Sequence, residues 1–218
     1  MSQINVRAYL APVPVLATKG SLTLDALLYA AMYLKTGHYD PEAWRDLPLE
    51  KVTFSLPEGD SEECFYRCTG IQPDPKTVQP ELATYRRRFK SERMASFSTI
   101  SVQMNMSSGT YKAWDITRAG FKAKYAEWAA EGDIATVESL LKHLTNIGGC
   151  AGKGYGQVLR WELTPLDGDG HLPLWDEDGI PLRPIPVAAG ITPPVQREVM
   201  GVPHRTPGYA CPLLPCYM

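Results

Sequence analysis

A short segment near residue 150 has the composition of a ligand-binding loop. Five glycines fall within nine residues, at positions 148, 149, 152, 154 and 156. Glycine permits positive φ angles and leaves no side chain between backbone and ligand, so successive N–H groups can face phosphate oxygens. We expect Lys153 to supply positive charge and Tyr155 a stacking surface. The candidate ligand-binding residues of this loop are Gly149, Gly152, Lys153, Gly154, Tyr155 and Gly156.

The residues around these glycines exclude two common phosphate-binding loops. A Walker A loop needs a glycine, four residues and then Gly-Lys-Ser/Thr, but position 147 is Ile and position 154 is Gly. A Rossmann fingerprint opens a helix after a strand, whereas this segment leaves a predicted helix and enters a predicted strand. A loop lying along a nucleic-acid backbone remains. The alternative is that the glycines only allow tight packing against the first helix, with Tyr155 in the core.

Positive charge is concentrated in one part of the chain. The net charge is −2, yet residues 85–128 contain nine basic and only three acidic side chains. A local basic block on an acidic body suits a phosphate-binding surface, although a solvated basic loop explains the block equally well. The candidate RNA-binding residues of this block are Arg86, Arg87, Arg88, Lys90, Tyr111 and Lys112.

The cysteines indicate no metal site. There are five of them and the N-terminus lacks the pattern of a signal peptide, which favours reduced thiols and a cytoplasmic protein. Cys64 and Cys68 lie in a predicted strand, where a rise of roughly 3.3 Å per residue would hold them too far apart for one zinc ion. We therefore expect neither metal nor cofactor.

The spacing of apolar residues predicts an α+β fold. Strand and helix patterns alternate, and the predicted order is strand, helix, strand, strand, insertion, helix, strand, which is the β-α-β-β-α-β unit of ferredoxin-like and RNA-recognition folds. Asp115 would cap the helix over 116–131, whose Phe121, Tyr125 and Trp128 would face the core. The predicted strands span 4–10, 52–56, 64–69, 96–106 (paired with 110–114) and 157–163, and the predicted helices span 24–36, 116–131 and the segment beginning at Asp133.

The predicted organisation is a core with one insertion and one extension. The core covers residues 1–164, with a basic insertion containing a β-hairpin at about 76–115. Residues 165–218 hold 11 of the 19 prolines and show no sustained periodicity. Because proline removes backbone donors, we expect this proline-rich extension to be ordered by docking on the core or on a neighbouring subunit.

A resemblance to a known family follows from these features. A glycine-rich loop between the last helix and last strand of a ferredoxin-like fold resembles the RAMP superfamily of CRISPR proteins. The segments Leu24-Asp25-Ala26-Leu27-Leu28 and Ser108-Gly109-Thr110-Tyr111-Lys112-Ala113-Trp114-Asp115 are similar to segments of the small RAMP subunit of type IV effector complexes. The proline-rich region from Pro193 to Met200 is also similar.

The resemblance implies a group-five Cas role: a non-catalytic subunit of an antiviral ribonucleoprotein that caps the 5′ handle of the crRNA. Its implied partners are that handle, the backbone RAMP subunits and the large subunit, with target DNA near the protospacer-adjacent motif as a further candidate.

Some RAMP proteins instead cleave precursor crRNA with a histidine, and in these a catalytic histidine can follow the first helix. His38, beside Lys35 and Tyr39, is the candidate here, although a histidine also suits a helix C-terminus electrostatically. The other histidines are His143, His171 and His204, and no two histidines are close in sequence. We therefore predict a binder without catalytic residues.

Overall fold

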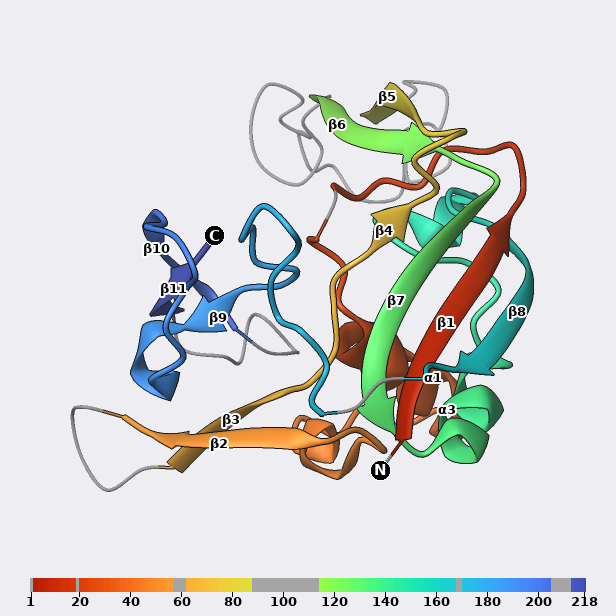
Figure 1. Cartoon of the computed structure of the whole chain (residues 1–218). Coiled ribbons are helices and arrows are strands. Elements are labelled where there is room, and N and C mark those ends of the chain that lie inside the picture. The colour runs from red at the N-terminus through yellow and green to blue at the C-terminus, as the bar shows by residue number, and fades with distance from the viewer. Residues whose placement is uncertain (1, 19, 57–61, 88–113, 168–169, 205–212) are drawn as a thin grey trace, which may run out of the picture.

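The chain has a mixed α+β structure with antiparallel sheets, as the sequence predicts. The computed structural model describes residues 2–18, 20–56, 62–87, 114–167, 170–204 and 213–218 (Figure 1). The elements, in chain order, are β1 (Ser2–Leu10), α1 (Leu24–Thr36), η1 (Ala43–Asp46), β2 (Lys51–Ser55), β3 (Glu62–Tyr66), β4 (Gln72–Pro73), β5 (Gln79–Arg87), β6 (Trp114–Lys122), β7 (Tyr125–Gly132), α3 (Ile134–Leu141), η4 (Ala151–Lys153), β8 (Val158–Pro165), β9 (Ile185–Pro186), η5 (Val187–Ala189), β10 (Val199–Pro203) and β11 (Leu213–Tyr217).

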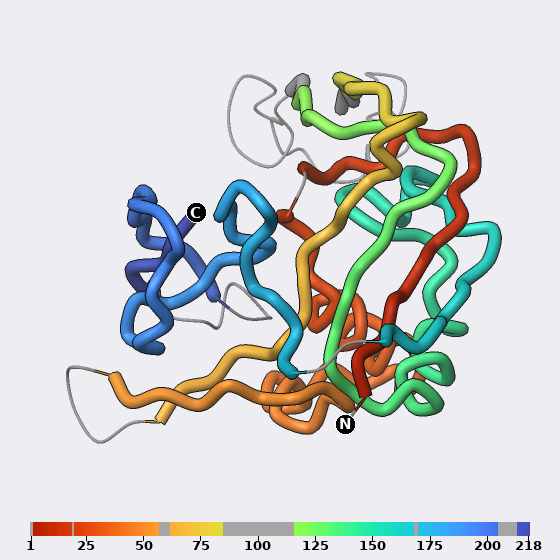
Figure 2. The backbone as a smooth tube through the Cα atoms, viewed as in Figure 1, coloured from red at the N-terminus to blue at the C-terminus, as the bar shows by residue number. Residues whose placement is uncertain are grey.

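A four-stranded antiparallel sheet with the strand order β4-β7-β1-β8 organises the first part of the chain. β1 lies at its centre, where Val6 is opposite Trp128 of β7 and Leu163 of β8. The chain passes from β1 through α1 before it reaches β4, and from β7 through α3 to β8. In Figure 2 the α1 segment lies behind the strands. One face of the sheet is therefore covered by helix. On the other face, which we call the open face, the extension lies over the end at Gln3 and Glu131, because Gln3 donates to Gly170 O and Glu131 accepts from Leu172 N–H.

The elements that build this layer follow from their residue patterns. Alternate residues of β1, from Ile4 to Leu10, are buried, which is the period of a strand with one covered face. The stripe of Leu24, Leu27, Leu28 and Ala31 packs α1 against them. Gly37 ends α1 in the left-handed conformation, with its N–H bonded to Tyr33 O. The predicted strand over 4–10 and the predicted helix over 24–36 are confirmed.

The predicted helix over residues 116–131 is wrong, because this segment forms the strands β6 and β7. Phe121, Tyr125 and Trp128 happen to fall at helical spacing, which suggested a helix. However, Ala126, Trp128 and Ala130 alternate as buried residues and lie opposite β1. Pairing with a central strand decides the conformation here, against the local helical spacing.

The second and third strands of the sheet also differ from the prediction. The segments predicted as strands over 52–56 and 64–69 form a separate β2–β3 hairpin, with Val52 opposite Phe65. β4 and β7 occupy the two places in the sheet that these segments were expected to fill. The strand predicted over 96–106 and its hairpin turn lie outside the described residues.

The extension after β8 forms a second sheet and a second apolar cluster. β9, β10 and β11 pair in the order β10-β11-β9. Leu174 and Ile185 of the extension pack with Phe54 of β2 and Phe65 of β3. The hairpin therefore packs on the extension as well as on the first core, and residues far apart in sequence share one cluster.

A buried charged contact fastens the extension to α1. The Arg183 guanidinium donates to Tyr66 O at 2.5 Å and to His204 O at 2.7 Å, and it lies 3.6 Å from Asp25 Oδ2. Asp25 and Arg183 are both almost fully buried. Burial alone would lower the pKa of Arg183, but the charge and contact of Asp25, together with the nearby Cys68, outweigh it and keep the pKa above its ordinary value.

Candidate nucleic-acid interface

The glycine-rich loop joins α3 to β8, as predicted, and lies against the segment that leaves β1. Asp133 caps α3 by accepting from Thr136 N–H at 2.9 Å. Beyond α3, the N–H of Gly149 donates to Leu16 O at 2.9 Å and that of Gly156 donates to Pro14 O at 2.8 Å. The two ends of the loop are therefore anchored, and its packing partner is the β1–α1 connection, not the first helix.

The glycines of this loop have different roles. Gly148, Gly154 and Gly156 have positive φ angles of 80°, 87° and 61°. A Cβ on Gly156 would lie 1.9 Å from Ile147 O, so a side chain cannot fit there. Gly152, by contrast, has open space around it and no positive φ. Gly154 and Gly156 therefore need the conformational freedom of glycine, whereas neither the backbone conformation nor the protein neighbours of Gly152 require it.

The middle of the loop faces solvent. Gly152, Lys153 and Gly154 are exposed, and Tyr155 is half-buried rather than part of the apolar core. The N–H groups of Lys153 and Gly154 bond to Cys150 O and Ala151 O, which closes the η4 turn. These two amides are occupied within the protein, whereas the exposed Lys153 side chain can reach a ligand.

A ribbon formed by β5 and β6 brings another cation to the loop. Val15 pairs with Phe121 of β6 while its neighbour Leu16 pairs with Gly149. Arg118 of β6 is exposed, and its Nη1 lies 3.8 Å from where a Cβ of Gly149 would stand. Sequence reasoning missed this proximity because it placed Arg118 in a helix. The pairing of β5 with β6 positions it instead.

The charge around the loop is positive. Among the described residues, Arg118 has no salt-bridge partner, whereas Lys122 on the same strand pairs with Glu81. Residues 139–161 contain no acidic residue, although Lys142 and Arg160 pair with Glu138 and Glu162 just outside them. Lys153 and Arg118 are therefore the cations that an anionic ligand meets at the loop.

The basic block is only partly described. The backbones of Arg86 and Arg87 lie at the end of β5, opposite Asp115 and Trp114 of β6. Arg88, Lys90, Tyr111 and Lys112 lie outside the described residues. The β5–β6 ribbon runs from the Gln79–Lys122 pair at its base to the Arg87–Trp114 pair at its far end (Figure 1). The role of these residues in RNA binding stays a prediction.

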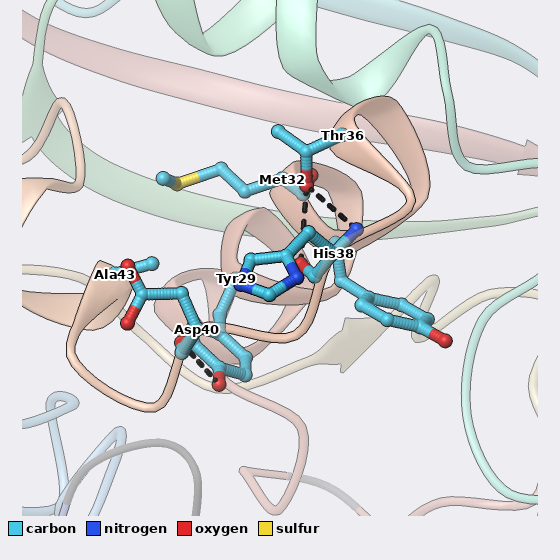
Figure 3. A pocket seen from close by; sticks show the side chains of 7 residues that line it. Tyr29, Met32, Thr36, His38, Asp40 and Ala43 are labelled. Carbon is cyan, nitrogen blue, oxygen red and sulfur yellow. Dashed lines mark hydrogen bonds between the residues drawn. The ribbon is translucent and has the colours of Figure 1, made fainter.

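A cavity lies at the C-terminal end of α1 and includes His38. It has a volume of about 180 Å³. Figure 3 shows His38 with Tyr29, Met32 and Asp40 around it, and the Tyr29 hydroxyl donates to Asp40 O at 2.9 Å. Burial, with the neighbouring Tyr39, raises the pKa of Tyr29 to about 12. Such a hydroxyl holds its proton at neutral pH and is a weak proton donor for catalysis.

In the part of the chain that the structure describes, no three His, Cys, Asp or Glu side chains are arranged to hold a metal ion. None of the described helices has the length and apolar character needed to cross a membrane.

No protein-family model matches the sequence, and a comparison with curated proteins also finds no match.

Proposed function

We propose that this chain is a non-catalytic crRNA-binding subunit of a type IV CRISPR ribonucleoprotein, active in the cytoplasm. It would cap the 5′ handle of the guide RNA and help to seat the backbone RAMP subunits, the large subunit and target DNA. The observation that carries this proposal is the glycine-rich loop between α3 and β8, anchored at both ends with Lys153 exposed between them.

The arrangement of the first layer supports a ferredoxin-like RAMP core. The order β1-α1-β4-β7-α3-β8, with the sheet order β4-β7-β1-β8, is that of a β-α-β-β-α-β split unit. In this comparison the β2–β3 hairpin and the β5–β6 ribbon are insertions. The glycine loop then occupies the position, between the last helix and last strand, on which the resemblance to RAMP proteins depends.

The charge at the loop supports a nucleic-acid ligand. Lys153 and Arg118 come from elements distant in sequence, yet both lie at the loop and both are exposed. Phosphate groups are the natural partners of such exposed cations, and each contact releases counterions, so binding should weaken as salt rises. A subunit that contacts only protein would not require this arrangement.

The experiment that tests the proposal is recovery of bound RNA. The full chain, expressed with its CRISPR array and purified at low salt, should retain short RNAs whose sequenced 5′ ends all begin with the same repeat-derived handle. RNA of random sequence, or no RNA at low salt, would contradict the proposal.

The His38 cavity supports a second candidate function, a RAMP endoribonuclease that processes precursor crRNA. It is the weaker candidate because RNA cleavage needs both a base and an acid, and the Tyr29 hydroxyl of this cavity, with its pKa raised to about 12, is a weak proton donor. Incubation with repeat RNA decides between the two. Specific cleavage that His38→Ala abolishes would establish the nuclease in place of the binder.

A further inference from the structure

The open face of the four-stranded sheet carries a group of aromatic and charged side chains. α1 covers the opposite face, so in Figure 1 the open face is turned toward the viewer. In β1, residues between the buried ones point to this side, and they include Arg7 and Tyr9. The neighbouring strands contribute Tyr125 opposite Tyr9 on β7, and Arg160 opposite Tyr9 on β8.

These side chains form two stacked pairs. The rings of Tyr9 and Tyr125 have centroids 6.2 Å apart. The Arg160 guanidinium lies over the Tyr9 ring, 3.6 Å from its centroid, and the Arg7 guanidinium lies over the Tyr125 ring at 4.5 Å. Ring and guanidinium planes are thus gathered in one row across three adjacent strands.

Two carboxylates hold the row in place. Glu127 accepts from Arg7 Nε at 2.8 Å and from Asn5 Nδ2 at 3.1 Å. Glu162 accepts from the Tyr9 hydroxyl at 3.1 Å and from Arg160 Nη1 at 3.0 Å. Their side chains remain about 28% and 36% exposed, so both can still accept a hydrogen bond from a ligand. The row is preorganised before any ligand arrives.

The row is continuous with the glycine loop. β8 begins just after Gly156, so Arg160 follows the loop by four residues. Hydrogen bonds also connect the end of β1 to the end of the loop and to β7. Ala11 N–H donates to Gln157 O at 2.9 Å, and Leu10 N–H donates to Lys124 O at 2.9 Å. Lys124 is exposed at this end of the sheet. A strand of RNA that reaches the loop therefore has this end of the open face within reach.

We propose that the open sheet face binds unpaired bases of the RNA whose backbone contacts the glycine loop, with Tyr9, Tyr125, Arg7 and Arg160 as the stacking surface. This inference rests on the proposed function. Single-stranded RNA is recognised by stacking of splayed bases on aromatic rings and guanidinium planes. Glu127 and Glu162 at the edge of the row can accept hydrogen bonds from the N–H groups of a base.

The chemistry of the face favours a base over a protein surface. Stable protein contacts need a desolvated apolar centre, whereas Asn5, Glu127 and Glu162 surround this row with polar groups. In a duplex each base is stacked between its neighbours, so double-stranded RNA would leave the rings unused. The expected occupant is thus a short unpaired stretch of RNA.

Replacement of each tyrosine by leucine tests the inference. Tyr9→Leu and Tyr125→Leu keep an apolar side chain suited to a strand but remove the aromatic ring. Binding of a fluorescein-labelled single-stranded RNA with the handle sequence, measured by anisotropy in the full chain, should weaken at least about fivefold for each variant, the lower end of one base–aromatic stack. The slope of log K against log salt should not change, because stacking releases no counterions.

Two controls make the result specific. Tyr33→Leu removes a more exposed tyrosine on α1, on the other side of the sheet, and should leave the affinity unchanged. Tyr125→Phe keeps the ring and should bind within about twofold of wild type if stacking is the interaction. Thermal melts of all variants show whether any loss of affinity reflects unfolding.

The outcomes separate this inference from the proposed function. If wild type binds the RNA and Lys153→Ala weakens it while both tyrosine variants bind normally, the sheet face is not part of the site and the inference is overturned. If folded Tyr9→Leu and Tyr125→Leu bind weakly with an unchanged salt slope, it is supported. If wild type binds no RNA, both proposals fall. If Tyr9→Leu and Tyr125→Leu bind RNA normally but no longer bind a partner subunit of the complex, the face belongs to a protein partner and the inference is overturned.

Discussion

Arginine occurs in two contrasting settings in this protein. Arg183 is 2% exposed, and two backbone carbonyls and the Asp25 carboxylate surround its guanidinium. Arg118 is exposed beside the glycine loop without a salt-bridge partner among the described residues. A buried and paired cation can only hold the fold together, whereas an exposed one can meet a ligand. The two settings therefore predict opposite responses to mutation.

Removal of Arg183 should have the largest effect. Arg183→Ala leaves Asp25 buried without its countercharge and frees two carbonyls, so we expect a loss of about 3–5 kcal/mol in the free energy of unfolding. Urea unfolding followed by circular dichroism measures it. Arg118→Ala is the matched control and should stay within about 0.5 kcal/mol of wild type. Equal stabilities of the two variants would contradict the view that Arg183 stabilises the fold while Arg118 does not.

This contact also changes an expectation from the sequence. A core that ends at residue 164, as the sequence predicts, should stay folded when the extension after Leu163 is removed. Because Arg183 neutralises Asp25 and Leu174 covers Phe65, the truncated chain should instead be strongly destabilised. A truncated protein with a cooperative thermal transition close to that of the full chain would contradict this prediction.

Thiol reactivity should distinguish the same two regions. Cys68 is fully buried beside Arg183, and burial raises the pKa of its thiol to about 12. A folded-state pKa this high leaves the thiol protonated and unreactive at pH 8. Cys150 is half-exposed in the glycine loop. Alkylation of the native protein with iodoacetamide, followed by mass spectrometry, should label Cys150 at least about a hundredfold faster than Cys68. Similar rates would show that the Arg183 region opens readily.

Two glycines of the loop should differ in their tolerance of alanine. Gly156→Ala places a Cβ against Ile147 O at a positive φ, so we expect a loss of about 1–3 kcal/mol in the free energy of unfolding. Gly152→Ala meets open space and should change stability by less than about 1 kcal/mol. Thermal and urea unfolding of both variants gives the comparison. A costly Gly152→Ala would mean that the middle of the loop is packed.

Sequence reasoning succeeded where a local pattern decides the structure. The alternation from Ile4 to Leu10, the stripe of α1 and the cap at Asp133 all identified their elements, and the loop was placed between α3 and β8. It failed over 116–131, where pairing of Trp128 with Val6 outweighs helical spacing. It also misread Tyr125 as a core residue, although Tyr125, Glu127 and Ala129 alternate with the buried side chains of β7.

Contacts between distant segments could not be predicted in this way. Asp25 and Arg183 are separated by most of the chain, and neither carries a local signal of the other. The same holds for Arg118 and Gly149, which meet only because the β5–β6 ribbon and the loop both pack on Val15 and Leu16. The candidate site was therefore found from its loop, but its second cation was found only in the folded chain.

The salt dependence of RNA binding by wild type and Lys153→Ala tests the central claim most directly. Binding of single-stranded handle RNA should weaken as salt rises. Lys153→Ala should lower the affinity and reduce the slope of log K against log salt by about 0.7, the value for one phosphate contact on a single strand. Its unfolding curve should match that of wild type, because Lys153 is exposed. The account would be contradicted if wild type bound no RNA at low salt, or if Lys153→Ala left both the affinity and the salt slope unchanged.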